Sequence, residues 1–119
     1  MIVLDDGLAR AEVHPDQGAA VGRYELRGKH GNLEPIFQTA ASIGRGGPFA
    51  LGLNLLIPFS NRISGGGFRH DGVFHALERN AADPYPIHGN AFSLPWSIRE
   101  TTANRAVLTL KSEKPLTSS

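Results

Sequence analysis

Two short polar segments are the parts of this sequence best suited to chemistry. Asn61 and Arg62 follow an apolar run that ends at Pro58-Phe59, and His88 stands in the segment Pro86-Ile87-His88-Gly89. An arginine guanidinium carries a planar fork of donors that suits vicinal hydroxyls as well as carboxylates. A histidine can exchange a proton near neutral pH. Together these residues are the ingredients of a sugar site, with donors for hydroxyl groups and one group that can move a proton.

Each segment also has a plainer interpretation. Arg62 is an ordinary solvated side chain if nothing binds it, and for an isolated arginine this is the more frequent outcome. His88 could be a turn histidine that donates a hydrogen bond to a backbone carbonyl. The setting favours a ligand site, because proline and glycine frame both segments beside apolar anchors. Functional residues gather in loops that a rigid scaffold positions.

Other candidate motifs carry less weight. His70 and His75 share one face of a predicted ribbon, but two histidines without a third ligand make a poor zinc site. Residues 44–47 (GRGG) resemble a single RGG box without aromatic partners. The sequence has neither a nucleotide P-loop nor a G-x-S-x-G nucleophile elbow. We therefore predict no metal and no other cofactor.

The elements that must position these residues are short strands. Residues 8–14 and 19–26 alternate or are rich in β-forming side chains, and the turn residues between them predict an opening hairpin. Asp71-Gly72 separates two β-like runs and predicts a two-residue hairpin turn with positive φ at both residues. Its register pairs His70 with Val73 and Phe68 with His75.

The rest of the chain is also read as strands and loops. Residues 34–38 and the apolar run at 53–59 are predicted strands, the second of them buried. Residues 80–96 contain three prolines and predict an ordered loop, while 96–100 and 105–111 predict another hairpin. No segment carries a helical stripe of useful length, so we predict an all-β fold. Residues 112–119 are predicted to be an irregular tail.

Composition restricts the classes of partner. The chain has 119 residues, which suits one domain or part of one, and its formal net charge is +1. So weak a field favours neither nucleic acid nor an anionic membrane as a partner. No apolar run approaches the roughly 20 residues of a membrane-spanning helix. The sequence has no cysteine and no basic, apolar leader, which favours a cytoplasmic location.

The order and spacing of the motifs resemble a known family. The segments PFSNRISGGGFRHDGVFHAL (58–77) and NAADPYPIHGNAFSLPW (80–96) are similar to the N-terminal part of the aldose 1-epimerases, the galactose mutarotase family. The shared pieces are an N-R-I after an apolar run, a hairpin around D-G, an Asn, P-I-H-G and a Trp: Asn61-Arg62-Ile63, Asp71-Gly72, Asn80, Pro86–Gly89 and Trp96. The resemblance spans about residues 7 to 111.

The resemblance implies a fold and an activity. It implies a large antiparallel β-sandwich of the galactose mutarotase type, of which residues 1–119 would be a single, incomplete N-terminal portion. It also implies interconversion of the α and β anomers of an aldohexose by acid–base ring opening, with no cofactor. Glucose, galactose and a hexose 6-phosphate all remain open as the sugar.

Site roles follow from the matching positions only. The resemblance gives Arg62 as the arginine that hydrogen-bonds sugar hydroxyls and His88 as the first catalytic histidine, which also contacts the substrate. It gives Asn61 as support for the loop or a secondary sugar contact. Phe68, Phe74 and Trp96 are expected to pack on the sheet rather than to stack on sugar.

The sequence also departs from the family pattern. The second catalytic histidine of the family lies in a mid-chain His-Pro motif, whereas His14-Pro15 precedes Asn61 and Arg62. The general-base glutamate of the family lies near the C-terminus, and Glu100 and Glu113 come too early to match it. We therefore expect the front part of an epimerase, which could be inactive by itself.

An incomplete sandwich leads to one further expectation, and two alternative functions stay open. Unpaired sheet edges and an uncovered apolar face favour self-association. The alternative to a catalytic function is a non-catalytic carbohydrate-binding β-module, and a third possibility is an interaction fragment in which Arg62 and His88 are solvated.

Overall fold

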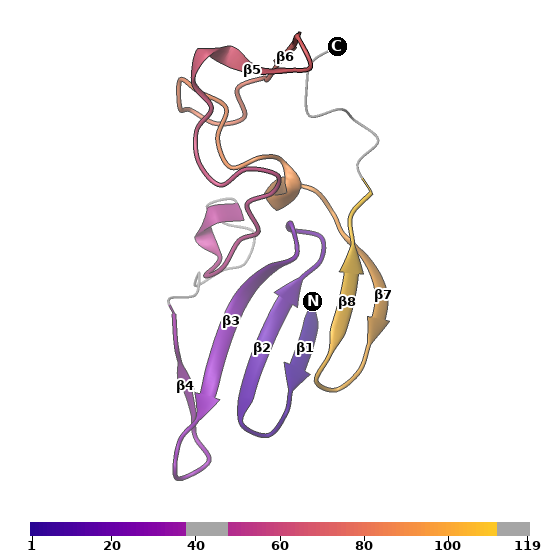
Figure 1. Ribbon diagram of the computed structural model, residues 1–119. Helices are drawn as coiled ribbons and strands as arrows, with labels where there is room; N and C mark the ends of the chain where they lie inside the picture. Colours follow the sequence, from indigo (N-terminus) through magenta and orange to yellow (C-terminus); the bar gives the residue numbers. More distant parts are fainter. Residues whose placement is uncertain (38–47, 112–119) are drawn as a thin grey trace.

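The protein is described by a computed structural model that places residues 1–37 and 48–111. The described residues form antiparallel β-strands and three short 3₁₀ turns, with no α-helix among them (Figure 1). The predicted all-β class is therefore confirmed. The irregular tail predicted at 112–119 and the end of the strand predicted at 34–38 lie outside the described residues.

The largest element is a four-stranded antiparallel sheet in the order β1-β2-β3-β4. Its strands are β1 (Ile2–Asp5), β2 (Ala9–His14), β3 (Ala20–Arg27) and β4 (Leu33–Pro35). The predicted opening hairpin is confirmed as β2 and β3. The sequence reasoning missed β1, and the strand predicted at 34–38 begins one residue late and continues past β4, which ends at Pro35.

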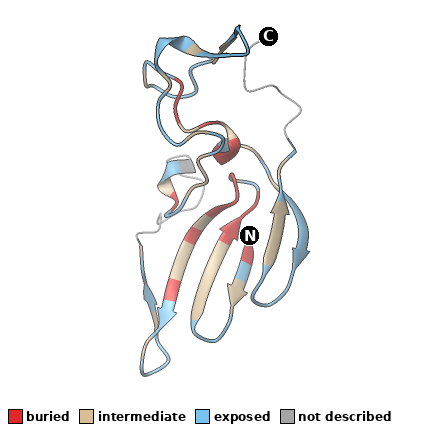
Figure 2. Cartoon of the chain, in the orientation of Figure 1, coloured by how far each residue is buried: buried red, intermediate tan, exposed pale blue. Residues whose placement is uncertain are grey.

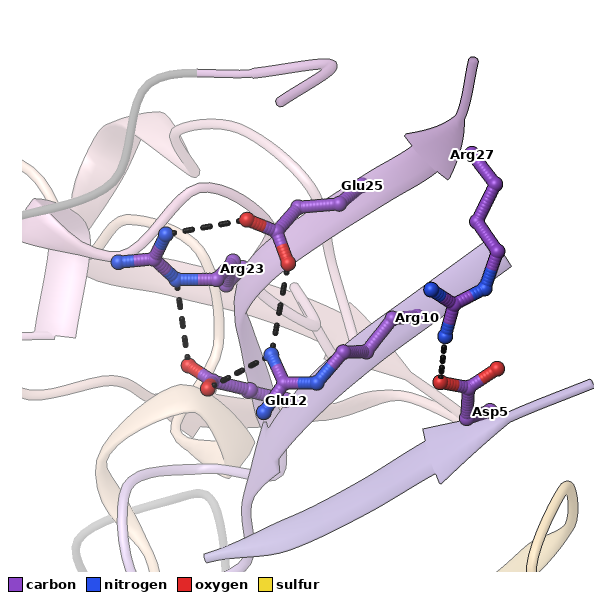
Figure 3. A network of polar contacts seen from close by, with 6 residues as sticks. All are labelled: Asp5, Arg10, Glu12, Arg23, Glu25 and Arg27. Carbon is purple, nitrogen blue, oxygen red and sulfur yellow. Dashed lines mark hydrogen bonds and ion pairs between the residues drawn. The ribbon is translucent and has the colours of Figure 1, made fainter. Parts of the chain in front are cut away.

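The sheet has one apolar and one charged face because its strands alternate in polarity. Ile2 pairs with Val13 and Leu4 with Ala11 on the apolar face. On the other face, Arg10 lies opposite Glu25 and Glu12 lies opposite Arg23. These four side chains form an alternating square of charges on β2 and β3, and Arg27 pairs with Asp5 beside it (Figure 3).

Both predicted downstream hairpins are confirmed. β5 (Gly67–His70) pairs with β6 (Val73–Ala76) in the predicted register, with His70 opposite Val73 and Phe68 opposite His75. The turn has φ of 48° at Asp71 and 76° at Gly72, which is the left-handed geometry that an Asp-Gly hairpin requires. β7 (Ser97–Thr101) pairs with β8 (Ala106–Thr109).

The apolar run at 53–59 is not the buried strand that its composition predicted. Leu53 forms a single antiparallel bridge with Val21, and the residues after it belong to no strand. Ile57 is 46% exposed, and its carbonyl accepts hydrogen bonds from the amides of Asn90 and Ala91. Pro58 has no amide to donate to a ladder, so this backbone closes a loop instead of extending a sheet.

The buried residues gather where the turn between β2 and β3 meets the loops. Val13, Ala20, Leu51 and Phe92 are all buried there, around the 3₁₀ turns η1 (Pro48–Ala50) and η3 (Ala91–Ser93) (Figure 2). Gly18, at φ 67°, allows the close approach, because a Cβ there would lie 2.1 Å from the Phe92 carbonyl oxygen. This junction connects the sheet to the loops that carry Arg62 and His88.

The aromatic side chains of the β5–β6 hairpin are not packed as predicted. Phe68 is 43% and Phe74 47% exposed, because the hairpin lies at the end of the molecule opposite the four-stranded sheet (Figure 1). Phe68 stacks on His75 with a ring separation of 5.3 Å. Trp96, by contrast, is half-buried and donates its indole N–H to the Ala91 carbonyl.

Candidate functional site

The structure brings the two predicted polar segments together. The His88 amide donates to the Asn61 carbonyl over 3.2 Å, and the Ile63 amide donates to the Pro86 carbonyl over 3.1 Å. Arg62 and Ile87 form an antiparallel bridge between these two bonds. Asn61, Arg62 and His88 therefore lie in adjacent backbone segments although Arg62 and His88 are 26 positions apart in the sequence.

The segment around His88 has an unusual backbone. His88 and Gly89 have φ of 64° and 67°, so two consecutive residues adopt the left-handed conformation. This conformation is uncommon for a residue with a side chain. At Gly89 no side chain fits, because a Cβ would lie 2.0 Å from the Ile57 carbonyl oxygen. The tight turn fixes where the imidazole of His88 leaves the backbone.

The ring of His88 is held on one side. Its Nδ1 lies 2.6 Å from the carbonyl oxygen of Ser60. Since a carbonyl only accepts, Nδ1 carries the proton, and Nε2 of the neutral ring is then an acceptor. Phe49 meets the ring edge-on at 5.5 Å and packs on Phe92 at 4.7 Å. His88 thus donates to a backbone carbonyl through Nδ1, as expected for a histidine in a turn, and Nε2 is left for contacts with a ligand.

Arg62 has an ionic partner that the sequence reasoning missed. Its Nε and Nη2 both donate to Oδ2 of Asp83, over 2.7 and 2.6 Å. The hydrogen bond from Arg62, followed by that from the Tyr85 amide, lowers the pKa of Asp83 below that of an ordinary aspartate, and the carboxylate raises the pKa of Arg62. The two residues are 21 positions apart, and nothing in their spacing signals the pair.

Asn61 supports the arginine. Its Oδ1 accepts from the Arg62 amide over 2.9 Å and from Arg62 Nη1 over 3.3 Å. The guanidinium is therefore oriented by Asp83 along one edge and by Asn61 near the other. The Arg62 side chain is still 50% exposed, whereas that of Asp83 is only 17% exposed. Arg62 can donate to a ligand oxygen while the less exposed Asp83 stays behind it.

This arrangement can bind hydroxyl groups and exchange one proton. Arg62 offers oriented N–H donors, and His88 Nε2 offers an acceptor that becomes a donor when it is protonated. Asp83 is poorly suited as a base, because Arg62 stabilises its ionised form. His88 is then the group of this site that is suited to proton transfer.

Other parts of the structure offer less. Within the described ranges, no three histidine or acidic side chains come together as metal ligands would. His70 and His75 lie 6.5 Å apart by ring centre on the exposed β5–β6 hairpin. A cavity of about 190 Å³ is lined by residues of β1, β2, β3 and the turn after β1, together with Asn104 of the β7–β8 turn, and does not include the Arg62 or His88 loops. No helix among the described residues is long and apolar enough to cross a membrane.

Comparisons with known proteins place this geometry in context. The sequence model of one family, described as aldose 1-epimerase, matches residues 1–118. A search of curated proteins found no significant sequence match. A crystal structure from Escherichia coli K12, provisionally described as an aldose 1-epimerase, superposes with a TM-score of 0.80 at 22% sequence identity. The match covers 94% of this chain and 36% of that one, so the chain spans about a third of the structure it resembles.

Proposed function

Because the chain belongs to the aldose 1-epimerase family, we propose that it binds an aldohexose or a related sugar at Arg62, Asn61 and His88 and takes part in interconverting the α and β anomers. The observation that carries this proposal is the pairing of the two loops, which sets the half-exposed Arg62 beside a histidine whose Nδ1 is held by Ser60. In this proposal residues 1–119 are a single N-terminal portion of an epimerase-like domain.

The proposed roles follow from the donors and acceptors. Arg62 donates to vicinal hydroxyls of the sugar, and Asn61 and Asp83 keep the guanidinium oriented. His88 contacts the sugar near the anomeric centre through Nε2. Neutral Nε2 accepts a hydroxyl proton, and protonated Nε2 donates a proton to an oxygen.

The reaction itself needs two proton transfers. A base takes the proton of the anomeric hydroxyl, the bond between C1 and the ring oxygen breaks, and an acid protonates that oxygen as the C1 carbonyl forms. The carbonyl then rotates, and the ring closes on its other face with both protons returned. Each well-placed proton-transfer group contributes about 10²–10⁴ in rate. His88 is proposed for one of the two transfers.

A second candidate function is a carbohydrate-binding module that does not catalyse. The carboxylate beside the sugar-binding arginine, Asp83, is tied to Arg62 and has a lowered pKa, which favours this alternative. His88 would then serve as a hydrogen-bonding contact only. The two functions make the same prediction for binding and opposite predictions for the rate of anomer exchange.

Two measurements separate the proposals. In a titration with galactose or glucose followed by NMR, we expect the amide signals of Arg62 and His88 to move and Arg62→Ala to abolish these shifts. Arg69→Ala is the matched control, because Arg69 is on β5 and lies over the ring of Phe74 on β6. This substitution should leave the sugar-dependent shifts unchanged. If neither sugar moves any amide signal of the wild type, both proposed functions are overturned.

Polarimetry then tests the reaction. Freshly dissolved α-galactose and α-glucose relax to their anomeric equilibrium, and heat-denatured chain supplies the background rate. Faster relaxation with the native chain, lost in His88→Ala, supports the epimerase function. Binding without acceleration favours the module.

The absence of cysteine supports a cytoplasmic location as part of the same proposal.

A further inference from the structure

The side chain of Asn80 makes three hydrogen bonds to the backbone on either side of His88. Its Oδ1 accepts from the Ile87 amide over 3.0 Å, and its Nδ2 donates to the carbonyls of Ile87 and Gly89 over 2.7 and 2.6 Å. Asn80 itself lies in the loop after β6, so these bonds join two separate parts of the loop region. No other side chain in the described part of the chain is shown to bond the backbone on both sides of one residue in this way.

The three bonds fix the amide orientation of Asn80. Both carbonyl oxygens face Nδ2, and the Ile87 amide N–H faces Oδ1. A carboxamide flipped by 180° would place Oδ1 against the two carbonyl oxygens, which repel it. An aspartate of the same shape could keep only the bond from Ile87 and would be repelled by the two carbonyls. The position therefore requires a carboxamide.

The bonds act on the part of the loop that is hardest to hold. His88 and Gly89 both have left-handed φ, and a residue with a side chain adopts that conformation only when its surroundings impose it. The Asn80 carboxamide holds Ile87 before and Gly89 after this turn. The direction of the His88 ring, and so the bond from Nδ1 to Ser60, depends on that backbone.

We propose that Asn80 is a positioning residue for His88: it fixes the left-handed turn so that Nδ1 stays bonded to Ser60 and Nε2 stays free as an acceptor. The sugar that Nε2 meets rests on the proposed function, whereas the effect of Asn80 on the ring does not. The hydrogen bonds of the Asn80 side chain go to the backbone of Ile87 and Gly89, so it acts through the backbone.

The test compares Asn80→Asp with Asn104→Asp, which changes an asparagine in the turn between β7 and β8 whose Oδ1 accepts from Thr102. The readout is the pair of ring ¹⁵N chemical shifts of His88 in the chain without sugar, which report which nitrogen carries the proton. We expect Asn80→Asp to lower the fraction of rings protonated at Nδ1 alone, and Asn104→Asp to leave it unchanged. A purely structural role would change the melting temperature without moving this tautomer.

Galactose affinity is the second readout. We expect Asn80→Asp to weaken binding about tenfold and Asn104→Asp to have no effect. If Asn80→Asp does not fold, the neutral Asn80→Ser must move the His88 ring shifts in the same direction. Wild-type ring shifts in a folded Asn80 variant would overturn the proposal.

The two proposals fail in distinguishable ways. If the wild type binds neither galactose nor glucose while Asn80→Asp still moves the His88 tautomer, the proposed function falls and the positioning role stands. If the wild type binds sugar and the Asn80 variants keep both the wild-type tautomer and the wild-type affinity, the positioning role falls alone.

Discussion

At the scale of single residues, Arg62 and His88 are held in the same way. In each side chain some nitrogens are hydrogen-bonded within the protein while another part can contact a ligand. Asp83 engages Nε and Nη2 of Arg62, and Ser60 engages Nδ1 of His88. Such fixed partners reduce the conformational freedom that a side chain must lose when a ligand binds. This is why a half-exposed arginine is a better candidate for sugar binding here than an arginine without partners.

The pairing of Arg62 with Asp83 makes a prediction about pH. The folded carboxyl has a lowered pKa, so the stability it contributes is present above its unfolded value, near 3.8, and is lost only as pH falls through the lower folded value. We expect the ¹³C signal of the Asp83 carboxyl to titrate with a midpoint below 3.8. Arg62→Ala should move this midpoint upward.

Arg79 supplies the control for that titration. It donates to the backbone carbonyl of Asp83, and its charge is the weakest of the influences that lower the pKa of the Asp83 carboxyl. Arg79→Ala should therefore move the midpoint less than Arg62→Ala does. An Asp83 midpoint that is the same in the wild type and in Arg62→Ala would show that the ion pair does not form in solution.

At the scale of elements, local patterns were predictable and long-range partners were not. The Asp71-Gly72 turn determines its own hairpin, so its register followed from four neighbouring residues. The apolar run at 53–59 was misread, because whether such a run forms a strand depends on partners elsewhere in the chain. The same limit hid the contacts of Asp83 and of Asn80, whose partners lie 21 and 7 to 9 positions away.

The square of charges on β2 and β3 was within reach of the sequence. Arginine and glutamate alternate in Ala9–His14 and again in Ala20–Arg27. Once the hairpin register is set, each arginine lies opposite a glutamate. Ion pairs of 3.0 to 3.5 Å run along and across the strands, so each of the four side chains has two neighbours of opposite charge (Figure 3).

The square predicts a measurable loss of stability. The Glu25 side chain is only 9% exposed and faces both Arg10 and Arg23. Removing its charge with Glu25→Gln leaves two arginines close together with less compensation. Exposed pairs are worth about 0–1 kcal/mol and fully buried ones about 3–5 kcal/mol when one partner is removed, so we expect a loss of about 1–2 kcal/mol in urea unfolding.

Glu100→Gln is the matched control for the square. Glu100 pairs with Arg105 on the β7–β8 hairpin, and both side chains are more than half exposed. This substitution should change the free energy of unfolding by less than about 0.5 kcal/mol. Equal effects of the two substitutions would mean that partial burial gives the square no extra stability.

At the scale of the whole molecule, the described structure is elongated. It measures 59 × 28 × 22 Å, and its radius of gyration is 17.1 Å, whereas a compact domain of this size has about 13 Å. No large side chain among the described residues is fully buried. Two of its three sheets are two-stranded ribbons, which are marginally stable without further packing.

These features predict self-association through the sheet edges. Val73 on β6 and Ile98 on β7 are 57% and 52% exposed, and strands with free edges and apolar side chains pair with other chains. Light scattering coupled to size-exclusion chromatography at micromolar concentration should give a mass above the 12.8 kDa of one chain.

Val73→Lys combined with Ile98→Lys should lower that mass, because a charge on an edge strand opposes pairing. Leu8→Lys, in the turn between β1 and β2, is the control and should leave it unchanged. A sharp monomer peak from the wild type, with cooperative thermal unfolding, would contradict this prediction and show that the chain is stable with its edges unpaired.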